Sequence, residues 1–186
     1  MTWNQIEGWF SPDDALFVSN VCKQISGGIV VELGFFAGKS TAVMAPVCQK
    51  NGNEYHAVDN CEGASPRDPA TKAQQSRDMM AVFEGNMSRL KLLDYINVHR
   101  LDSAASAQLF GDGEVDFCFV DASHIEEDVQ KDIEAWWPKI KNGGVLGGHD
   151  YSWGSVKSAT NRFADKHGLK LIVSGNCWKL NKRSEK

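Results

Sequence analysis

The sequence predicts an α/β fold built on a mostly parallel β-sheet. Short runs rich in β-branched and aromatic residues alternate with longer segments of helical periodicity, a pattern typical of βαβ units. The last two strand-like runs are separated only by the turn SGN at 174–176. So short a connection requires an antiparallel pair, because a parallel return needs a dozen or more residues. We therefore expect six or seven strands that finish in an antiparallel hairpin.

One domain accounts for the whole chain. Its 186 residues, 42% of them hydrophobic, suffice for one buried core and are too few for two ordinary domains. We expect an N-terminal helical segment (1–27), a core (28–180) and a basic tail (181–186).

The first helix is predicted to begin after Ser11, which can act as its N-cap. Pro12 suits the first helical position, and the two aspartates that follow it complement the positive end of the helix dipole. The first strand is expected at 28–33, and a second helix near Lys39.

Polar residues end each of the next four predicted strands. These strands are expected at 54–60, 96–103, 115–123 and 143–150. Their terminal polar residues are Asp59, Asp102, Asp121, His149 and Asp150. Ligands of open parallel sheets bind beyond the carboxyl ends of the strands. We therefore expect these side chains, together with Glu32 of the first strand, to line one rim of the sheet.

Two further elements are expected in the last third of the chain. Gly143 and Gly144 are predicted to close the helix before the fifth strand, because glycine tolerates the left-handed conformation found at helix ends. A last helix is predicted from about Trp153 to His167, before the terminal hairpin.

Composition and charge indicate a small-molecule partner. The formal net charge is −4 and the clear basic cluster is the C-terminal tail, so no continuous surface for nucleic-acid phosphates is expected. No apolar run approaches the roughly 18 residues needed to cross a bilayer, and the first residues lack the basic-then-apolar order of a signal peptide. We expect a soluble, cytoplasmic protein that binds neither nucleic acid nor membrane, with a homo-oligomer left open.

A glycine loop follows the first strand, in the stretch VVELGFFAGKST, which ends like a phosphate-binding P-loop. A P-loop needs four residues between its glycines, whereas Gly34 and Gly38 enclose three, two of which are bulky phenylalanines. The pattern E-x-G-x-x-x-G fits better: Glu32 ends the strand, Gly34 makes a tight turn, and Gly38 lets the next helix pack closely. An acid at the strand end favours an amine-bearing or cationic ligand over a phosphate.

The carboxylate after the second strand favours a nucleoside ligand. Asp59 follows Gly38 by about 20 residues, the spacing at which a Rossmann-like fold offers a carboxylate to a ribose diol. One carboxylate can accept hydrogen bonds from both ribose hydroxyls.

Five stretches, taken in order, resemble the class I S-adenosylmethionine-dependent methyltransferases: VVELGFFAGKST, AVDN, LDS, VDFCFVDASH and GGVLGGHDY. The block from Asp121 to Tyr151 resembles more narrowly methyltransferase family 24, a subgroup related to sugar and macrolide O-methyltransferases whose neighbourhood also includes a cephalosporin hydroxylase. The similarity covers about residues 28–180. It implies a Rossmann-like, doubly wound sheet, mostly parallel, of order 3-2-1-4-5-7-6 with strand 7 antiparallel.

The resemblance also implies S-adenosylmethionine as cofactor and assigns its binding residues. Those assigned to the methionine side are Glu32, Gly34, Phe35, Gly38 and Ser40. By the same likeness Asp59 holds the ribose, and Asp102 with Ser103 lies by the adenine. Asp121 borders the cofactor as well.

The helix after the fourth strand is predicted to start with the capping box Ser123-x-x-Glu126. His124 would then lie in its first turn, where the positive dipole end disfavours the imidazolium and keeps the ring neutral. A neutral histidine in the cleft can act as general base for a hydroxyl nucleophile. His124 and Asp121 are therefore the catalytic candidates; the alternative is a histidine that only covers the helix end.

Asp121, His149 and Asp150 form a candidate metal site. Carboxylates bind hard divalent cations, and such an ion beside the transferred methyl group would lower the pKa of a substrate hydroxyl. In the related sugar O-methyltransferases an aspartate after strand four and an acidic pair after strand five hold magnesium, with a histidine three residues past the first aspartate as base. Asp121, Asp150 and His124 match this pattern, whereas His149 departs from it. One imidazole with two carboxylates suits Mn, Fe or Zn as well as Mg; without a metal, His149 would only bind substrate or brace a loop.

The leading hypothesis is an enzyme that transfers a methyl group from S-adenosylmethionine to an oxygen of a small polar acceptor, a sugar-like molecule being one candidate. The alternatives are a metal-dependent oxygenase on the same scaffold and a domain that binds the cofactor without chemistry. A dinucleotide oxidoreductase is disfavoured, because GFFAG departs from G-x-G-x-x-G.

Two segments are expected to border the acceptor. The polar stretch 60–80 is long enough to form a lid over the rim of the sheet. Trp3, Trp9 and Phe10 would add a hydrophobic wall from the N-terminal segment, although core packing explains them equally well.

Overall fold

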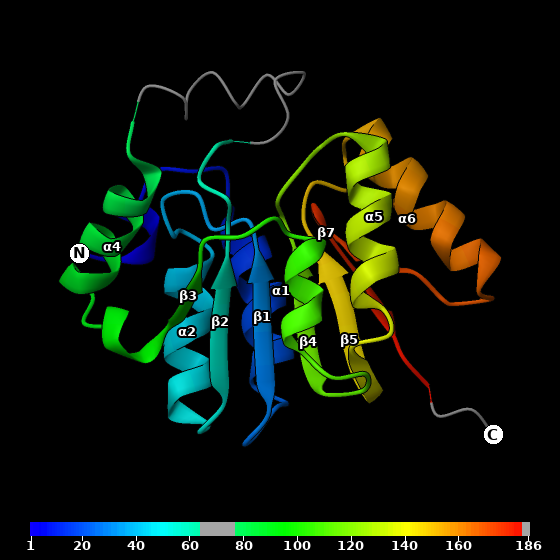
Figure 1. The fold of residues 1–186 in the computed structure, drawn as a ribbon, viewed down its shortest axis with the longest axis horizontal. Helices are drawn as coiled ribbons and strands as arrows, with labels where there is room; N and C mark the ends of the chain where they lie inside the picture. Colours follow the sequence, from blue (N-terminus) through cyan, green and yellow to red (C-terminus); the bar gives the residue numbers. More distant parts are fainter. Residues whose placement is uncertain (64–76, 184–186) are drawn as a thin grey trace.

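The computed structural model describes residues 1–63 and 77–183, and its centre is a seven-stranded sheet (Figure 1). The strands are β1 (Ile29–Leu33), β2 (Glu54–Val58), β3 (Asn97–His99), β4 (Val115–Val120), β5 (Ile140–Gly148), β6 (Ile172–Ser174) and β7 (Cys177–Asn181). Their order across the sheet is β3-β2-β1-β4-β5-β7-β6. The pairs from β3 to β5 are parallel, whereas β7 runs antiparallel to both β5 and β6. The predicted fold class and strand order are confirmed.

Helices cover both faces of the sheet. They are α1 (Pro12–Cys22), α2 (Thr41–Lys50), α4 (Met79–Arg89), α5 (Glu126–Trp136) and α6 (Gly154–Lys166), with 3-10 helices η1 (Trp3–Gln5), η2 (Leu93–Tyr95) and η3 (Ala105–Leu109). The first three helices share one core with Val30, and α5 and α6 share the other with Val31. Successive strand residues thus enter opposite cores, which explains why the strands read as continuous apolar runs. In the described part of the chain no helix is long and apolar enough to cross a membrane.

The carboxyl ends of the central strands lie level with one another. Leu33 pairs with Val58 of β2 and with Val120 of β4, and Val120 pairs with Gly148 of β5. The residues that follow these four strands therefore meet at one edge of the sheet. Strand order reverses beside β1, and this is where an open parallel sheet binds its ligands.

The helix α1 begins as predicted. Ser11 Oγ accepts a hydrogen bond from the backbone N of Asp14 at 3.2 Å, and the Asp14 carboxylate accepts one from the backbone N of Ser11 at 2.9 Å. This capping box satisfies two backbone donors that the helix cannot satisfy itself. The prediction for α6 is confirmed as well, because Trp153 and His167 are its two caps.

The helix before β5 ends earlier than predicted. It stops at Trp136, because Pro138 has no amide proton with which to continue the helix. Gly143 has the expected positive φ, +85°, but it lies inside β5 where the register with β4 shifts. Gly144 is also within the strand, and a Cβ atom there would lie 2.9 Å from the carbonyl oxygen of Asp116. The prediction that both glycines close the helix is wrong.

The helix α5 begins later than predicted, at Glu126, with Ile125 as its N-cap. Ser123 Oγ accepts a backbone hydrogen bond from Ile125 at 3.2 Å. The carboxylate of Glu126 binds Arg162 of α6 instead of returning to Ser123. The predicted capping box is therefore wrong, because the neighbouring helix takes the glutamate that would complete it. His124 precedes the helix and does not lie in its first turn.

Candidate active site

Two pockets open side by side at the carboxyl ends of the strands. The Asp59 pocket has a volume of about 500 Å³ and lies over the ends of β1, β2 and β3. The His124 pocket has a volume of about 540 Å³ and lies between β4, β5 and the N-terminal segment. Both pockets are lined by Gly34, Phe36, Asp121 and Ala122. The two cavities therefore adjoin at the tips of β1 and β4.

The glycine loop after β1 separates the two pockets. Gly34 has a φ of +84°, and a Cβ atom there would lie 2.2 Å from the carbonyl oxygen of Asp121, so only glycine fits. Gly38 has a φ of +87°, and its Cβ would lie 2.6 Å from Cε of Met87 in α4. The tight turn at Gly34 and the close helix packing at Gly38 are both as predicted.

Asp59 braces this loop from the neighbouring strand. Its Oδ2 accepts hydrogen bonds from the backbone N of Phe35 at 3.0 Å and of Phe36 at 3.1 Å, and its Oδ1 accepts one from Cys61 at 2.8 Å. The sequence did not indicate this bracing role. The carboxylate also lines the Asp59 pocket, and its oxygens have further acceptor sites. Binding of the ribose by Asp59 stays a prediction.

Glu32 lies buried beneath the loop and is not among the residues that line the two pockets. Its carboxylate accepts hydrogen bonds from the hydroxyls of Ser40, Thr41 (2.5 Å) and Tyr55 (2.9 Å). Burial raises the pKa of Glu32 to about 7, although the hydroxyl donors oppose this rise. Of this group Ser40 lines the His124 pocket, as does Phe35 of the loop. The contact between Glu32 and the cofactor stays a prediction without support from this arrangement.

The loop after β3 forms the far end of the Asp59 pocket. Asp102 Oδ1 accepts a hydrogen bond from the backbone N of Ala105 at 2.9 Å. Ser103 Oγ donates to the buried Asp132 of α5 at 2.6 Å, and the Trp136 indole donates to the Ser103 carbonyl oxygen at 2.8 Å. Burial raises the pKa of Asp132 to about 7, although the bond from Ser103 lowers it. Asp132, which the sequence did not single out, thus anchors the loop that carries the predicted adenine residues.

His124 and Asp150 pair at the edge of the His124 pocket. His124 Nε2 lies 2.6 Å from Asp150 Oδ2, and the imidazole stacks on Trp153 with ring centroids 4.6 Å apart. Ser155 Oγ donates to the His124 carbonyl oxygen at 2.6 Å. Burial raises the pKa of Asp150, but the bonds with His124 and His149 outweigh it and hold the pKa below its ordinary range. An ionised carboxylate, and not the first turn of a helix, therefore orients His124.

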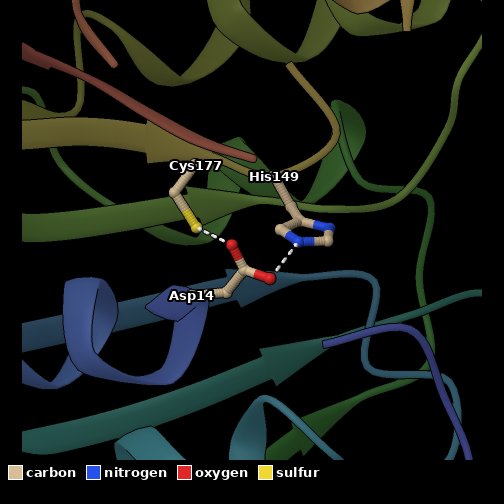
Figure 2. A group of neighbouring side chains, drawn as sticks. All are labelled: Asp14, His149 and Cys177. Atoms are coloured by element: carbon tan, nitrogen blue, oxygen red, sulfur yellow. Dashed lines mark hydrogen bonds and ion pairs between the residues drawn. The ribbon is translucent and has the colours of Figure 1, made fainter. Parts of the chain in front are cut away.

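His149 lies under Asp121 and Asp150 and is only 4% exposed. Its Nδ1 is 3.3 Å from Asp150 Oδ1 and 3.7 Å from Asp121 Oδ1, and its Nε2 is 3.2 Å from Asp14 Oδ2 (Figure 2). Burial would lower the pKa of His149, but the surrounding carboxylates raise it to about 10. Burial also raises the pKa of Asp121, to about 8, against the opposing effect of His149.

Donor atoms suited to a divalent cation converge at the His124 pocket. One atom each from Asp121, His124 and Asp150 lies within 4.8 Å of the others. His149 Nδ1 adds a second imidazole beside both carboxylates. Two carboxylates with two imidazoles suit Mn, Fe or Zn better than Mg. The structure thus groups two of the predicted metal ligands, Asp121 and Asp150, with His124, whereas the third, His149, is grouped with Asp14 and Cys177.

Three residues of the His124 pocket were not indicated by the sequence: Lys39, Trp153 and Asn176. Lys39 Nζ donates to the carbonyl oxygen of Gly8 at 2.8 Å, so the lysine of the P-loop-like motif ties the loop to the N-terminal segment. Asn176 Nδ2 donates to Asp150 Oδ1 at 3.0 Å. These residues lie in a loop, at a helix cap and in a hairpin turn, where periodicity carries no signal.

The N-terminal segment forms one wall of the His124 pocket, as predicted. Trp9 and Phe10 line it, and the Trp9 ring lies 5.9 Å from the ring of Phe36. Trp3 packs against the core instead and is not among the lining residues. Trp9 remains 70% exposed, which leaves its face available to a ligand. Residues 64–76 of the predicted lid lie outside the described part of the chain.

The sheet order, with its one antiparallel strand, is the one that the resemblance to class I S-adenosylmethionine-dependent methyltransferases implied. A family model described as a methyltransferase domain, methyltransferase family 24, matches residues 31–151. The chain belongs to this family, and the resemblance stated from its motifs is confirmed.

Solved structures with the same fold include several methyltransferases. A SAM-dependent O-methyltransferase from Thermotoga maritima is 15% identical, with a TM-score of 0.70 over 97% of this chain and 68% of that chain. The O-methyltransferase NovP is 13% identical, with a TM-score of 0.74 over 92% and 80%. An O-methyltransferase from Bacillus cereus, in complex with SAH, is 17% identical, with a TM-score of 0.67 over 96% and 85%. At these identities the likeness shows the fold.

Proposed function

We propose that the protein is a S-adenosylmethionine-dependent O-methyltransferase that acts on a small hydroxyl-bearing molecule. The observation that carries the proposal is the pair of adjoining pockets that share Gly34 and Asp121. The nucleoside of the cofactor would lie in the Asp59 pocket, between Asp59 and Asp102. The methyl group would then reach the shared rim and face the His124 pocket. The O-methyltransferases that share the fold support oxygen as the acceptor atom.

His124 is the general base of this mechanism. S-adenosylmethionine, when bound, would supply the methyl group and leave as S-adenosylhomocysteine, and the His124 imidazole would take the proton that the acceptor hydroxyl loses. Asp150 orients the ring and stabilises the imidazolium that forms. Holding the oxygen and the methyl carbon in line supplies the rest of the rate enhancement.

The acceptor pocket is walled by aromatic rings. Trp9, Phe10 and Phe36 lie on one side and Trp153 lies beside His124. The apolar face of a sugar ring can stack on such side chains while its hydroxyls meet His124 and Asp150. A sugar-like acceptor therefore remains one candidate.

A divalent cation held by Asp121, His149 and Asp150 is compatible with this site. The fit rests on the position of His149 Nδ1, which lies 3.7 Å from Asp121 Oδ1 and 3.3 Å from Asp150 Oδ1. When bound, such an ion lowers the pKa of the acceptor hydroxyl. No observation favours the oxygenase or the non-catalytic alternative over methyl transfer.

Calorimetric titration with S-adenosylhomocysteine and, separately, with NAD tests the assignment. We expect S-adenosylhomocysteine to bind and NAD to give no heat. Binding of NAD without S-adenosylhomocysteine would overturn the proposal. Incubation of the protein and S-adenosylmethionine with hydroxyl-bearing metabolites, followed by mass spectrometry, would then identify the molecule that gains one methyl group.

A further inference from the structure

A buried carboxylate of the N-terminal helix reaches the ends of the sheet strands (Figure 2). Asp14 lies in the first turn of α1 and is 4% exposed. Its Oδ2 is 3.2 Å from His149 Nε2, and its Oδ1 accepts a hydrogen bond from the Cys177 thiol of β7 at 3.6 Å. Neither Asp14 nor Cys177 is among the residues that line the two active-site pockets. The contact therefore lies beneath the site and not in it.

The position of the Asp14 carboxylate is set by contacts other than His149. Its Oδ2 accepts hydrogen bonds from the backbone N of Ser11 at 2.9 Å and from the Ser11 hydroxyl at 2.6 Å. The Cys177 thiol holds its other oxygen. A side chain fixed by a helix cap and by a neighbouring strand is a rigid support for the ring that it meets.

The backbone of His149 is fixed as well. Its N donates to the Val120 carbonyl oxygen at 3.1 Å, and its own carbonyl oxygen accepts from the Trp178 indole at 3.1 Å. Nε2 of His149 lies 3.2 Å from Asp14 Oδ2, an ion-pair contact, and Nδ1 lies on the other side of the ring. That nitrogen faces Asp150 at 3.3 Å and Asp121 at 3.7 Å.

We propose that Asp14 is a positioning residue that keeps Nδ1 of His149 aimed at Asp121 and Asp150. It would be the outer carboxylate of a carboxylate–histidine–metal arrangement, in which a second carboxylate fixes the ring and raises its basicity toward the ion. This proposal rests on the metal site proposed above.

Asp14, His149 and Cys177 could themselves be read as metal ligands, since their donor atoms lie within 4.8 Å of one another. Against this, the Cys177 thiol donates to Asp14 Oδ1 and burial raises the pKa of that thiol, so it is not the thiolate that binds a metal ion. The geometry thus favours a support for His149 over a second ion site.

The test is a calorimetric titration of MnCl₂ into the full chain, freed of metal by a chelator and saturated with S-adenosylhomocysteine. Asp14→Asn retains the size of the side chain and removes its charge. We expect it to weaken Mn²⁺ binding roughly 10- to 100-fold, as loss of an outer carboxylate does. Asp13→Asn changes the exposed neighbour in the same helical turn and should bind Mn²⁺ within about twofold of the unmodified protein.

Ser11→Ala separates the support of His149 from the capping of α1. Ser11 stabilises the helix through its hydrogen bonds with Asp14, and within the described part of the chain none of its hydrogen bonds joins it to His149. A purely structural role predicts that Ser11→Ala and Asp14→Asn weaken Mn²⁺ binding alike. The proposal predicts that Ser11→Ala lowers the melting temperature and leaves Mn²⁺ affinity near that of the unmodified protein. Equal Mn²⁺ affinity of Asp14→Asn and the unmodified protein overturns the proposal.

A spectroscopic readout decides the role of Asp14 independently of the ion. In ¹⁵N-histidine spectra the Nε2–H signal of His149, assigned by its loss in His149→Gln, should shift in Asp14→Asn and stay unchanged in Asp13→Asn. An unchanged signal in Asp14→Asn overturns the proposal, even if the protein binds no Mn²⁺. Failure of the proposed methyltransferase function would be detected separately, because S-adenosylhomocysteine would then not bind. If Asp14→Asn does not fold, Asp14→Glu replaces it: a displaced carboxylate should shift the same signal, and an unchanged signal contradicts the proposal.

Discussion

The orientation of the His124 ring is set by its contacts with Asp150 and Trp153 and not by its position in the sequence. The sequence placed it in the first turn of a helix, but it lies just before α5 and is bound to Asp150. Both placements make the ring a candidate base, for different reasons. A helix end acts on any side chain nearby, whereas a paired carboxylate also sets the direction in which the imidazole faces.

Replacing His124 by Ala should lower kcat roughly 10²- to 10⁴-fold, the range for loss of a general base. Affinity for S-adenosylhomocysteine should change little, because the cofactor would lie in the Asp59 pocket. Release of S-adenosylhomocysteine during turnover measures the first quantity, and calorimetry measures the second. His167→Ala, at the exposed C-terminal cap of α6, is the matched control and should retain full turnover. Equal turnover of the two variants would remove His124 from the mechanism.

Two restrictions exclude a side chain at Gly34: the backbone has a positive φ, and a Cβ atom would clash with a neighbouring backbone atom. Gly34→Ala should unfold the loop and abolish binding of S-adenosylhomocysteine, because its Cβ would lie 2.2 Å from Asp121 O at a φ of +84°. Gly113→Ala is the control: its φ is +71°, but no atom lies within 4 Å of the added Cβ. Gly113→Ala should cost only about 1–2 kcal/mol of unfolding free energy, measured by urea denaturation. Similar losses of unfolding free energy in the two variants would show that backbone strain alone, without the clash at Asp121, explains the requirement for glycine at position 34.

At the scale of elements, the loop after β3 is held by α5. Asp132 and Trp136, one helical turn apart, bind the side chain and the carbonyl oxygen of Ser103. The loop therefore keeps its place because a neighbouring helix offers one acceptor and one donor. Burial of Asp132 raises its pKa from the ordinary range of an aspartate to about 7.

The raised pKa of Asp132 predicts a dependence of stability on pH. The folded state binds this proton more tightly than the unfolded state, so the stabilisation is complete below about pH 4 and is lost as the pH rises to about 7. Asp132→Asn cannot titrate, and its free energy of unfolding should therefore fall less than that of the unmodified protein between these pH values. Urea denaturation at pH 4.5, 6 and 7.5 measures the difference. Glu127→Gln, exposed on the same helix, should keep the slope of the unmodified protein; the same slope for Asp132→Asn would contradict the prediction.

At the scale of the whole molecule, the two pockets lie where elements far apart in the sequence meet. The Asp59 pocket is lined by residues at the ends of β1 to β4. The His124 pocket is lined also by the N-terminal segment, by the N-cap of α6 and by the turn before β7. A ligand that fills the first pocket therefore contacts several strands at once. Its binding free energy adds to the stability of the folded chain as a whole.

S-adenosylhomocysteine at about a hundredfold excess over its Kd should raise the free energy of unfolding by about 2.7 kcal/mol, because it binds the folded state alone. Thermal unfolding with increasing ligand measures this effect as a rising Tm. NAD at the same concentration serves as the control and should leave the Tm unchanged. A rise with NAD and none with S-adenosylhomocysteine would contradict the cofactor assignment.

Local sequence patterns determined the order of the elements, the antiparallel hairpin, the cap of α1 at Ser11 and the gathering of Asp59, Asp102, Asp121 and Asp150 at one edge. These features follow from periodicity, capping and strand direction, which act over a few residues or follow from the parallel arrangement itself. The local sequence also indicated that glycine is required at position 34, because the motif that contains Gly34 marks a tight turn.

Only the tertiary structure decided which partners these residues have. Glu126 bonds to α6 instead of capping its own helix, Asp59 braces the glycine loop, and Asp14 of α1 meets His149 at the end of β5. Each of these contacts joins elements that are distant in the chain, and a local pattern carries no information about which distant side chain will face it. Packing of the helices on the two faces of the sheet makes that choice, because it fixes which buried polar groups lie close enough to satisfy one another.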